Sequence, residues 1–94
     1  MIKHNEYFDQ QVQSLAFERH GLKASVGVIA PGTYRFETAL AERMNVVSGL
    51  LEAKLPGSEQ FIPFAAGSYF EIAANSAFEV RVTHGSAYLC EYFS

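Results

Sequence analysis

The chain has no tryptophan, one cysteine and three prolines in 94 residues. A single cysteine excludes both an intrachain disulfide and a zinc site built from several thiolates. The seven lysines and arginines are scattered and the formal net charge is -3, so a nucleic-acid-binding surface is not expected. The apolar runs are far shorter than the roughly 20 residues that span a bilayer, and the first residues carry no signal-peptide segment. We therefore expect a soluble cytoplasmic protein with neither nucleic acid nor membrane as a partner.

What the sequence does contain is apolar material and regularly spaced turn residues. Hydrophobic residues make up 49% of the chain and aromatic residues 14%, which is enough for one packed core and predicts a single domain over residues 1–94. Turn signals separate short apolar stretches at HGLK (20–23), APG (30–32), LPG (55–57), AAG (65–67), AANS (73–76) and THG (83–85). Short strands between frequent turns are typical of an all-β sandwich or barrel.

Alternation within these stretches predicts strands that bury one face. Phe78, Val80 and Val82 share one face of such a strand, and the polar residues at 79, 81 and 83 share the other. About eight strands are expected, closing into a small β-barrel or jelly roll that can hold one small ligand. The run MNVVSGLLEAKL (44–55) is one strand-like stretch. TALAERM (38–44) is the one modest helix candidate, and a loop or a short 3₁₀ turn fits it equally well.

A series of short motifs gives the chain a resemblance to a known family. The motifs are NEYF (5–8), ASVGV (24–28), PGTYRFET (31–38), Glu42 and Met44 before VVSG, LPGS (55–58), AAGSYFEI (65–72), ANSAFEV (74–80) and AYLCEY (87–92). In this order they resemble the small single-domain cupins described as pyrimidine/purine nucleoside phosphorylases. The resemblance implies a cupin-type barrel that forms a homodimer. It also implies cleavage of the N-glycosidic bond of several purine and pyrimidine nucleosides by inorganic phosphate, which gives a free base and a pentose 1-phosphate.

The ligand positions of the general cupin pattern carry no histidine in this chain. Glu42 matches the glutamate of the first cupin motif, but the two preceding histidines correspond to Phe36 and Thr38. The histidine of the second motif corresponds to Phe78, and the three histidines of the chain stand elsewhere, at positions 4, 20 and 84. A tight transition-metal site needs three or four converging ligands. We therefore expect a metal-free barrel whose only co-substrate is inorganic phosphate, with no further cofactor.

Phosphorolysis of a nucleoside requires protein groups that bind the phosphate, the sugar and the base, and it needs no metal in principle. Phosphate must be held against C1′ of the sugar while positive charge builds on the ring, as in glycoside hydrolysis. A cation or a set of N–H and O–H donors serves the phosphate. A carboxylate serves the sugar hydroxyls and the developing charge. An apolar or aromatic surface serves the base.

Several polar residues are candidates for these roles, and each has a plainer alternative. Lys23 and Ser25 enter the ASVGV strand and are the preferred phosphate and substrate ligands, with Arg43 as a weaker second. Glu42 stands at the position that faces the interior of metal-binding cupins, so the resemblance implies a pocket carboxylate for the ribose hydroxyls. Thr38 stands at a cupin ligand position and is the second catalytic candidate. Solvated surface cations, an exposed glutamate and an ordinary strand-end threonine are the alternatives.

The aromatic residues allow two interpretations. Tyr88, Cys90 and Tyr92 share one face of SAYLCEY, and such stripes usually belong to a core. Buried tyrosine hydroxyls nevertheless need partners, which a polar cavity provides, so Tyr88 and Tyr92 are candidates for binding the base or the sugar. Cys90 is expected to be an inert core thiol, because phosphate is already the nucleophile. His20 and His84 are further possible donors to a leaving base.

Three other functions stay open from the sequence. A metal-free cupin could bind a nucleoside, a sugar or another small metabolite without any chemistry. The FIPF segment (61–64) and the terminal AYLCEYF segment could instead form an interaction surface for another chain. Hydrolysis in place of phosphorolysis is the nearest enzymatic alternative.

Overall fold

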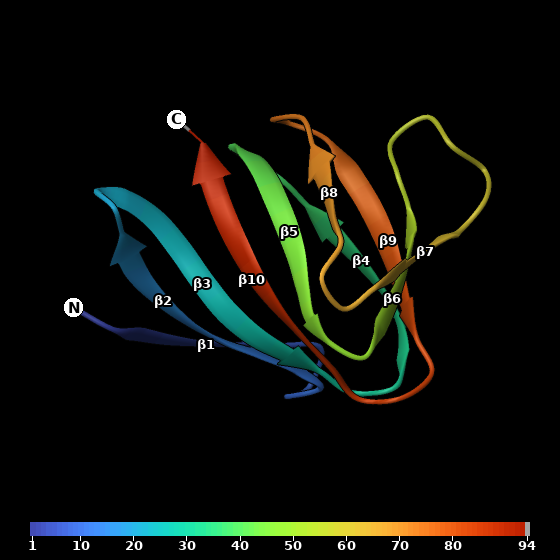
Figure 1. The fold of residues 1–94 in the computed structure, drawn as a ribbon, viewed down its shortest axis with the longest axis horizontal. Coiled ribbons are helices and arrows are strands. Elements are labelled where there is room, and N and C mark those ends of the chain that lie inside the picture. Colours follow the sequence, from blue (N-terminus) through green and yellow to red (C-terminus); the bar gives the residue numbers. More distant parts are fainter. Residues whose placement is uncertain (94) are drawn as a thin grey trace.

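The computed structural model describes residues 1–93, which form ten β-strands and the turns between them (Figure 1). The strands are β1 Lys3–Tyr7, β2 Val12–Arg19, β3 Leu22–Ile29, β4 Gly32–Glu37, β5 Ala41–Ser48, β6 Leu50–Lys54, β7 Ile62–Ala65, β8 Tyr69–Ile72, β9 Ala77–Val82 and β10 Ser86–Phe93. The prediction of an all-β chain is confirmed. Residues 1–93 contain no helix long and apolar enough to cross a membrane, and the cytoplasmic location stays a prediction.

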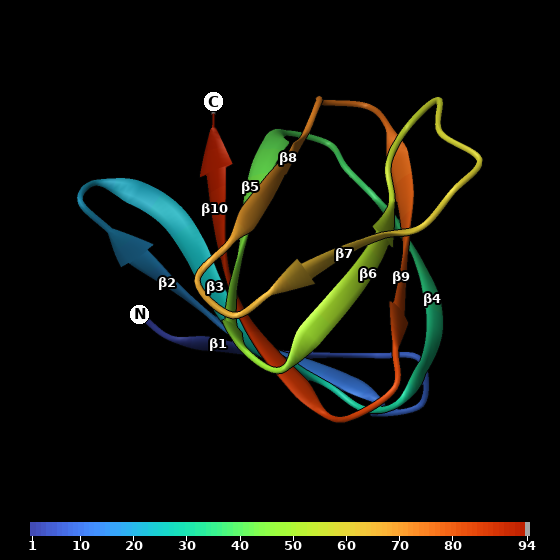
Figure 2. The same ribbon diagram turned by 45° about the vertical axis from the view of Figure 1, so that its right-hand side comes forward.

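The ten strands divide into two antiparallel sheets that face each other (Figure 2). The larger sheet has the order β1-β2-β3-β10-β5-β8, and the smaller one has the order β4-β9-β6-β7. The chain crosses repeatedly between the two sheets, so that β10 lies between β3 and β5 in the middle of the larger sheet. Both sheets therefore depend on pairings between residues far apart in the sequence.

The core lies between the sheets and follows the alternation of the strands. Phe78, Val80 and Val82 of β9 are buried, whereas the polar residues between them are more exposed, as predicted. Ile29 of β3 and Leu51 of β6 are among the largest fully buried side chains. Burial of such side chains contributes about 1.5–3 kcal/mol each, so the two inner faces hold the sheets together.

The number and bounds of the strands differ from the sequence-based expectation in two places. About eight strands were expected and ten are present, because residues 3–19 form an additional hairpin, β1 and β2. The single stretch predicted over 44–55 is divided at Gly49, which has a φ of +84° and joins β5 of the larger sheet to β6 of the smaller sheet. A Cβ at Gly49 would overlap the Ser86 side chain. The left-handed backbone and the close approach together explain a glycine at this corner.

The segment TALAERM does not form a helix. Residues 39 and 40 make a bend, and β5 begins at Ala41. Thr38, just after β4, is buried, and its hydroxyl donates to the Ala73 carbonyl oxygen at 2.7 Å. The Ser76 amide donates to the same hydroxyl oxygen at 2.9 Å. Thr38 thus ties the end of β4 to the turn between β8 and β9, and the loop interpretation of residues 38–40 was the right one.

Candidate active site

A pocket of about 230 Å³ opens between the two sheets, beside the strands that carry the predicted site residues. The larger sheet contributes Glu42 from β5 together with Tyr88, Cys90 and Tyr92 from β10. These four side chains come to one face because Tyr92 pairs with Glu42 across the strands and because residues two apart in a strand point the same way. The pocket therefore gathers a carboxyl, a thiol and two phenols on one wall.

The polar groups of this wall lie close to one another in two hydrogen-bonded pairs. The Cys90 thiol donates to Oε1 of Glu42 over 3.5 Å, and Tyr92 follows two residues later on the same face of β10. The Tyr92 hydroxyl lies 3.3 Å from the Ser25 hydroxyl of β3. The Nζ of Lys23 lies 5.0 Å from the centre of the Tyr92 ring, a cation–π distance. Four of the predicted residues, Lys23, Ser25, Glu42 and Tyr92, therefore meet in one place.

Burial controls the protonation of this wall. Desolvation raises the pKa of the Glu42 carboxyl, and the hydrogen bond from Cys90 and the charge of Lys23 oppose it with smaller effects. Desolvation also raises the pKa values of the Cys90 thiol and the Tyr92 phenol above their ordinary range, so both groups stay neutral at physiological pH. A raised carboxyl pKa favours the acid form, which is the form that donates a proton.

Tyr88 lies deeper in the same wall and is fixed by a glycine. A Cβ at Gly27 of β3 would overlap the Tyr88 ring, so the hydroxyl end of the ring packs directly against the backbone of the neighbouring strand. Desolvation raises the pKa of the Tyr88 phenol, and a hydrogen bond with Ser14 lowers it by less. The ring is 6% exposed. The hydroxyl of Tyr88 is thus held at the floor of the pocket and remains protonated.

The opposite wall is aromatic and comes from the smaller sheet. Phe36 of β4 and Phe78 of β9 pair directly across the strands and stack with ring centres 5.4 Å apart at 24°. These two residues stand at positions where the general cupin pattern has histidines. Phe8 packs edge-on against Phe36 at 5.5 Å, and it is held there by a turn in which Phe8, Asp9 and Gln10 all have positive φ. Such a turn is uncommon for residues other than glycine, and it completes an apolar surface suited to a flat base.

The rim of the pocket carries a cation and a carboxylate on β4. Arg35 and Glu37 both line the pocket, on either side of the inward-pointing Phe36. Nη1 of Arg35 donates to Oε1 of Glu37 at 2.9 Å, and both side chains are largely exposed. The Arg35 guanidinium can therefore bind an anion at the rim while it stays in contact with solvent.

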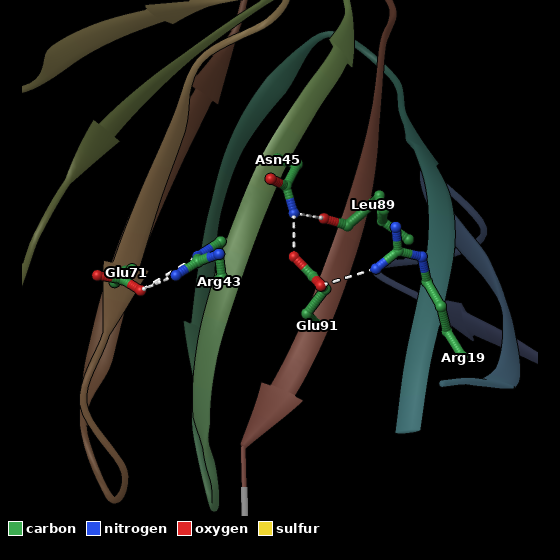
Figure 3. A network of polar contacts seen from close by, with 6 residues as sticks. All are labelled: Arg19, Arg43, Asn45, Glu71, Leu89 and Glu91. Atoms are coloured by element: carbon green, nitrogen blue, oxygen red, sulfur yellow. Dashed lines mark hydrogen bonds and ion pairs between the residues drawn. The ribbon is translucent and has the colours of Figure 1, made fainter. Parts of the chain in front are cut away.

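Four of the predicted site residues do not line this pocket, namely Lys23, Ser25, Thr38 and Arg43. Lys23 and Ser25 lie beside it, next to Tyr92. Thr38 is engaged in the turn contacts described above. Arg43 follows Glu42 in β5 and therefore points to the outer face of the larger sheet, where its Nε and Nη2 donate to Glu71 at 3.1 and 2.9 Å (Figure 3). Its guanidinium also lies over the rings of Tyr69 and Phe93.

The sequence analysis passed over several residues that line the pocket. Ser14, Tyr7 and Phe8 belong to the N-terminal hairpin, which was not predicted. Neither Glu37 nor Arg35 was among the candidate site residues. Because both flank the inward-pointing Phe36, the alternation of strand faces gave no signal for either.

Within residues 1–93, no group of three or more His, Cys, Asp or Glu side chains is arranged to hold a metal ion. The pocket lining contains three side chains of these types, Glu42 and Cys90 on one wall and Glu37 at the rim. His20 adopts a positive φ in the turn after β2, and neither His20 nor His84 lines the pocket. The donors present do not fit a transition-metal site, and the metal-free barrel stays a prediction.

The two facing antiparallel sheets and the pocket between them define the class of the protein, a small cupin-type β-barrel. An RmlC-like cupin from Shewanella frigidimarina superposes with a TM-score of 0.76 at 15% identity, over 97% of this chain and 82% of that one, which shows the common fold. The chain belongs to the pyrimidine/purine nucleoside phosphorylase family, whose model matches residues 2–92.

Relatives and solved structures agree with this assignment. Proteins named pyrimidine/purine nucleoside phosphorylase from Pseudomonas entomophila and Anaeromyxobacter sp. are 55% and 54% identical over 92 residues. The match covers 98% of this chain in both cases, and 98% and 88% of the relatives. A crystal structure of a protein of unknown function from Vibrio parahaemolyticus is 45% identical, with a TM-score of 0.95 over 99% of both chains.

Proposed function

We propose that this chain cleaves purine and pyrimidine nucleosides with inorganic phosphate, giving a free base and a pentose 1-phosphate. The observation that carries the proposal is the Glu42 carboxyl, whose pKa is raised by burial, facing a pocket with an aromatic opposite wall. The names of the relatives support the same reaction class. The proposal extends to a broad range of bases and to independence from metal ions.

In this reaction the bond between C1′ of the sugar and a ring nitrogen of the base breaks, and its electron pair goes to the base. The Glu42 carboxyl donates its proton to the departing base, which leaves as a neutral molecule. An oxygen of phosphate forms the new bond to C1′, where positive charge has built up. The proton that phosphate loses in becoming an ester returns to Glu42 through water. Glu42 thus acts as a general acid and not as the ribose-binding carboxylate expected from the sequence.

The tyrosines of the wall, and Lys23 and Ser25 beside Tyr92, bind and orient the substrates. Lys23 supplies a point charge for phosphate at the Tyr92 end of the pocket. The hydroxyls of Ser25 and Tyr92 supply neutral donors beside it. Tyr88, fixed over Gly27, presents its phenol to the sugar or the base. Thr38 and Arg43 have no direct role in this proposal, because Thr38 is engaged in turn contacts and Arg43 is paired with Glu71 on the outer face of the larger sheet.

Acceptance of both purines and pyrimidines follows from the chemistry of the lining. A hydroxyl donates or accepts a hydrogen bond according to its partner, whereas an amide side chain has fixed donors and acceptors. The described lining offers hydroxyls, a thiol and carboxyl groups, and includes neither asparagine nor glutamine. Bases with different patterns of donors and acceptors can therefore bind the same wall.

The test is to incubate protein stripped of metal with uridine and, separately, with inosine, with and without phosphate. Chromatography follows the free base and the pentose 1-phosphate. Base release that requires phosphate and yields the sugar phosphate supports the proposal. Release at the same rate without phosphate indicates hydrolysis. A nucleoside-dependent rise in melting temperature without any release indicates a binding protein.

We further propose that the chain forms a homodimer through the outer face of the larger sheet. That face exposes Leu15, Val26, Val28 and Val47, with Val28 and Val47 each 59% exposed. An open groove of about 670 Å³ lies over Val26 and Val28 and has no carboxylate in its lining, so it suits packing better than catalysis. Light scattering at micromolar concentration should give the dimer mass, and Val28→Lys should give the monomer mass.

A further inference from the structure

The chain has four arginines. They differ in how many hydrogen bonds their guanidinium groups donate to carboxylates. Arg43 and Arg81 each donate through both Nε and Nη2 to one carboxylate, Glu71 and Glu52 respectively. Both also stack on aromatic rings. Arg19, the third, donates to Glu91 on the outer face of the larger sheet (Figure 3). None of these three lines the pocket between the sheets.

Arg35 is the exception, because it lines the pocket and its bonding is incomplete. It donates to Glu37 through Nη1 alone, so within residues 1–93 its Nε and Nη2 make no hydrogen bond to a side chain. The Arg35 side chain is 63% exposed and that of Glu37 is 73% exposed. An ion pair exposed to this extent is weak. A doubly charged phosphate competes well for such a guanidinium, because two parallel N–H groups match two phosphate oxygens.

The position of Arg35 is fixed by its neighbours in β4. Phe36 points into the pocket and stacks on Phe78, which holds the backbone of β4 against β9. Arg35 is therefore kept at the rim while its long side chain stays free to turn. Lys23 of the larger sheet lies outside the lining of this pocket, with its Nζ 5.0 Å from the centre of the Tyr92 ring. Among residues 1–93, Arg35 is thus the one basic side chain in the lining of the pocket.

We propose that Arg35 is the principal phosphate-binding residue of this pocket and that phosphate displaces Glu37 from it. The proposal rests on the proposed phosphorolysis and deepens it by assigning the anion subsite. Glu37 acts as a competing internal carboxylate that occupies Arg35 when phosphate is absent. Removal of Arg35 and removal of the Glu37 charge should consequently change phosphate binding in opposite directions.

The experiment compares Arg35→Gln, Glu37→Gln and, as a matched control on the neighbouring strand, Arg81→Gln. Loss of a charged hydrogen-bond donor should raise the KM for phosphate about 10- to 100-fold in Arg35→Gln, with a much smaller change in the KM for uridine. Loss of the competing carboxylate should lower the KM for phosphate about two- to five-fold in Glu37→Gln. Arg81→Gln should keep the wild-type KM for phosphate.

A second measurement separates this assignment from the reaction itself. Phosphate alone, without nucleoside, should raise the melting temperature of the wild type and of Arg81→Gln, but not that of Arg35→Gln. If the wild type is stabilised in this way yet releases no base, the subsite stands and the phosphorolysis is wrong. If the wild type turns over and Arg35→Gln keeps its KM for phosphate, the phosphorolysis stands and the subsite is wrong. No stabilisation and no turnover in the wild type would overturn both.

Discussion

Replacement of Glu42 by glutamine tests the central step of the proposed reaction. The amide is close in size to the carboxyl and can keep the contact with Cys90, so the pocket should retain its shape. It cannot, however, give a proton to a departing base. General acid catalysis of this kind contributes about 10²- to 10⁴-fold to a rate. We expect Glu42→Gln to lower kcat for uridine and inosine by that factor.

The pH dependence follows from the direction of the Glu42 shift. Burial raises the pKa of this carboxyl, so the acid form persists to higher pH than for an exposed glutamate. Wild-type activity should fall as the pH rises through the raised pKa, because the carboxylate has no proton to donate. Glu42→Gln should lose this limb of the pH profile while keeping a low, pH-insensitive rate.

A substrate whose leaving group needs no proton makes the test specific. A pyridinium ribonucleoside releases a neutral base when its glycosidic bond breaks, so it does not require an acid. Steady-state rates at several pH values should show a large loss with uridine and little loss with the pyridinium substrate. An equal loss with both substrates would refute the general acid role and assign to Glu42 a role in binding or orientation.

Two further predictions concern the residues that shape the site. Gly27→Ala should lower stability by about 1–3 kcal/mol, because the new Cβ overlaps the Tyr88 ring. Thermal unfolding measures the loss, and Gly85→Ala, where a Cβ meets only an ordinary contact, is the control. Thr38→Val should cost about 1–3 kcal/mol of stability, since the Ser76 amide loses its acceptor, while kcat is retained. Thr33→Val, at an exposed position of the preceding strand β4, is its control. A 100-fold loss of kcat in Thr38→Val at unchanged melting temperature would show that Thr38 is a catalytic residue.

The alternation of residues predicted the buried faces but not the connections between strands. The core face of β9 was correct because period two is a local property of a half-buried strand. The N-terminal hairpin was missed, since its turn at residues 8–10 uses positive φ at three residues that are not glycine. The division at Gly49 was also missed, because one glycine in an apolar run does not reveal that the chain changes sheets.

In the site, too, the sequence predicted which residues share a strand face but not which strands meet. Tyr88 and Tyr92 were correctly grouped because they share a strand face, and the cupin resemblance brought Glu42 to them. Arg43 could have been excluded from the sequence, since adjacent residues of a strand point to opposite faces. Arg35 could not have been chosen in this way, because its own face of β4 points away from the core. It reaches the pocket only because β4 is an edge strand at the rim, which is a tertiary property.

The central place of β10 in the larger sheet has a consequence for synthesis of the protein. This strand is the last of the ten along the chain, yet it joins β3 to β5 and carries one wall of the pocket. Until residues 86–93 have left the ribosome, β3 and β5 each present an unpaired edge, and the earlier strands cannot close around a core. Folding must then wait for pairings between distant segments, which form slowly. The earlier strands are exposed to aggregation or chaperone binding until β10 pairs with β3 and β5.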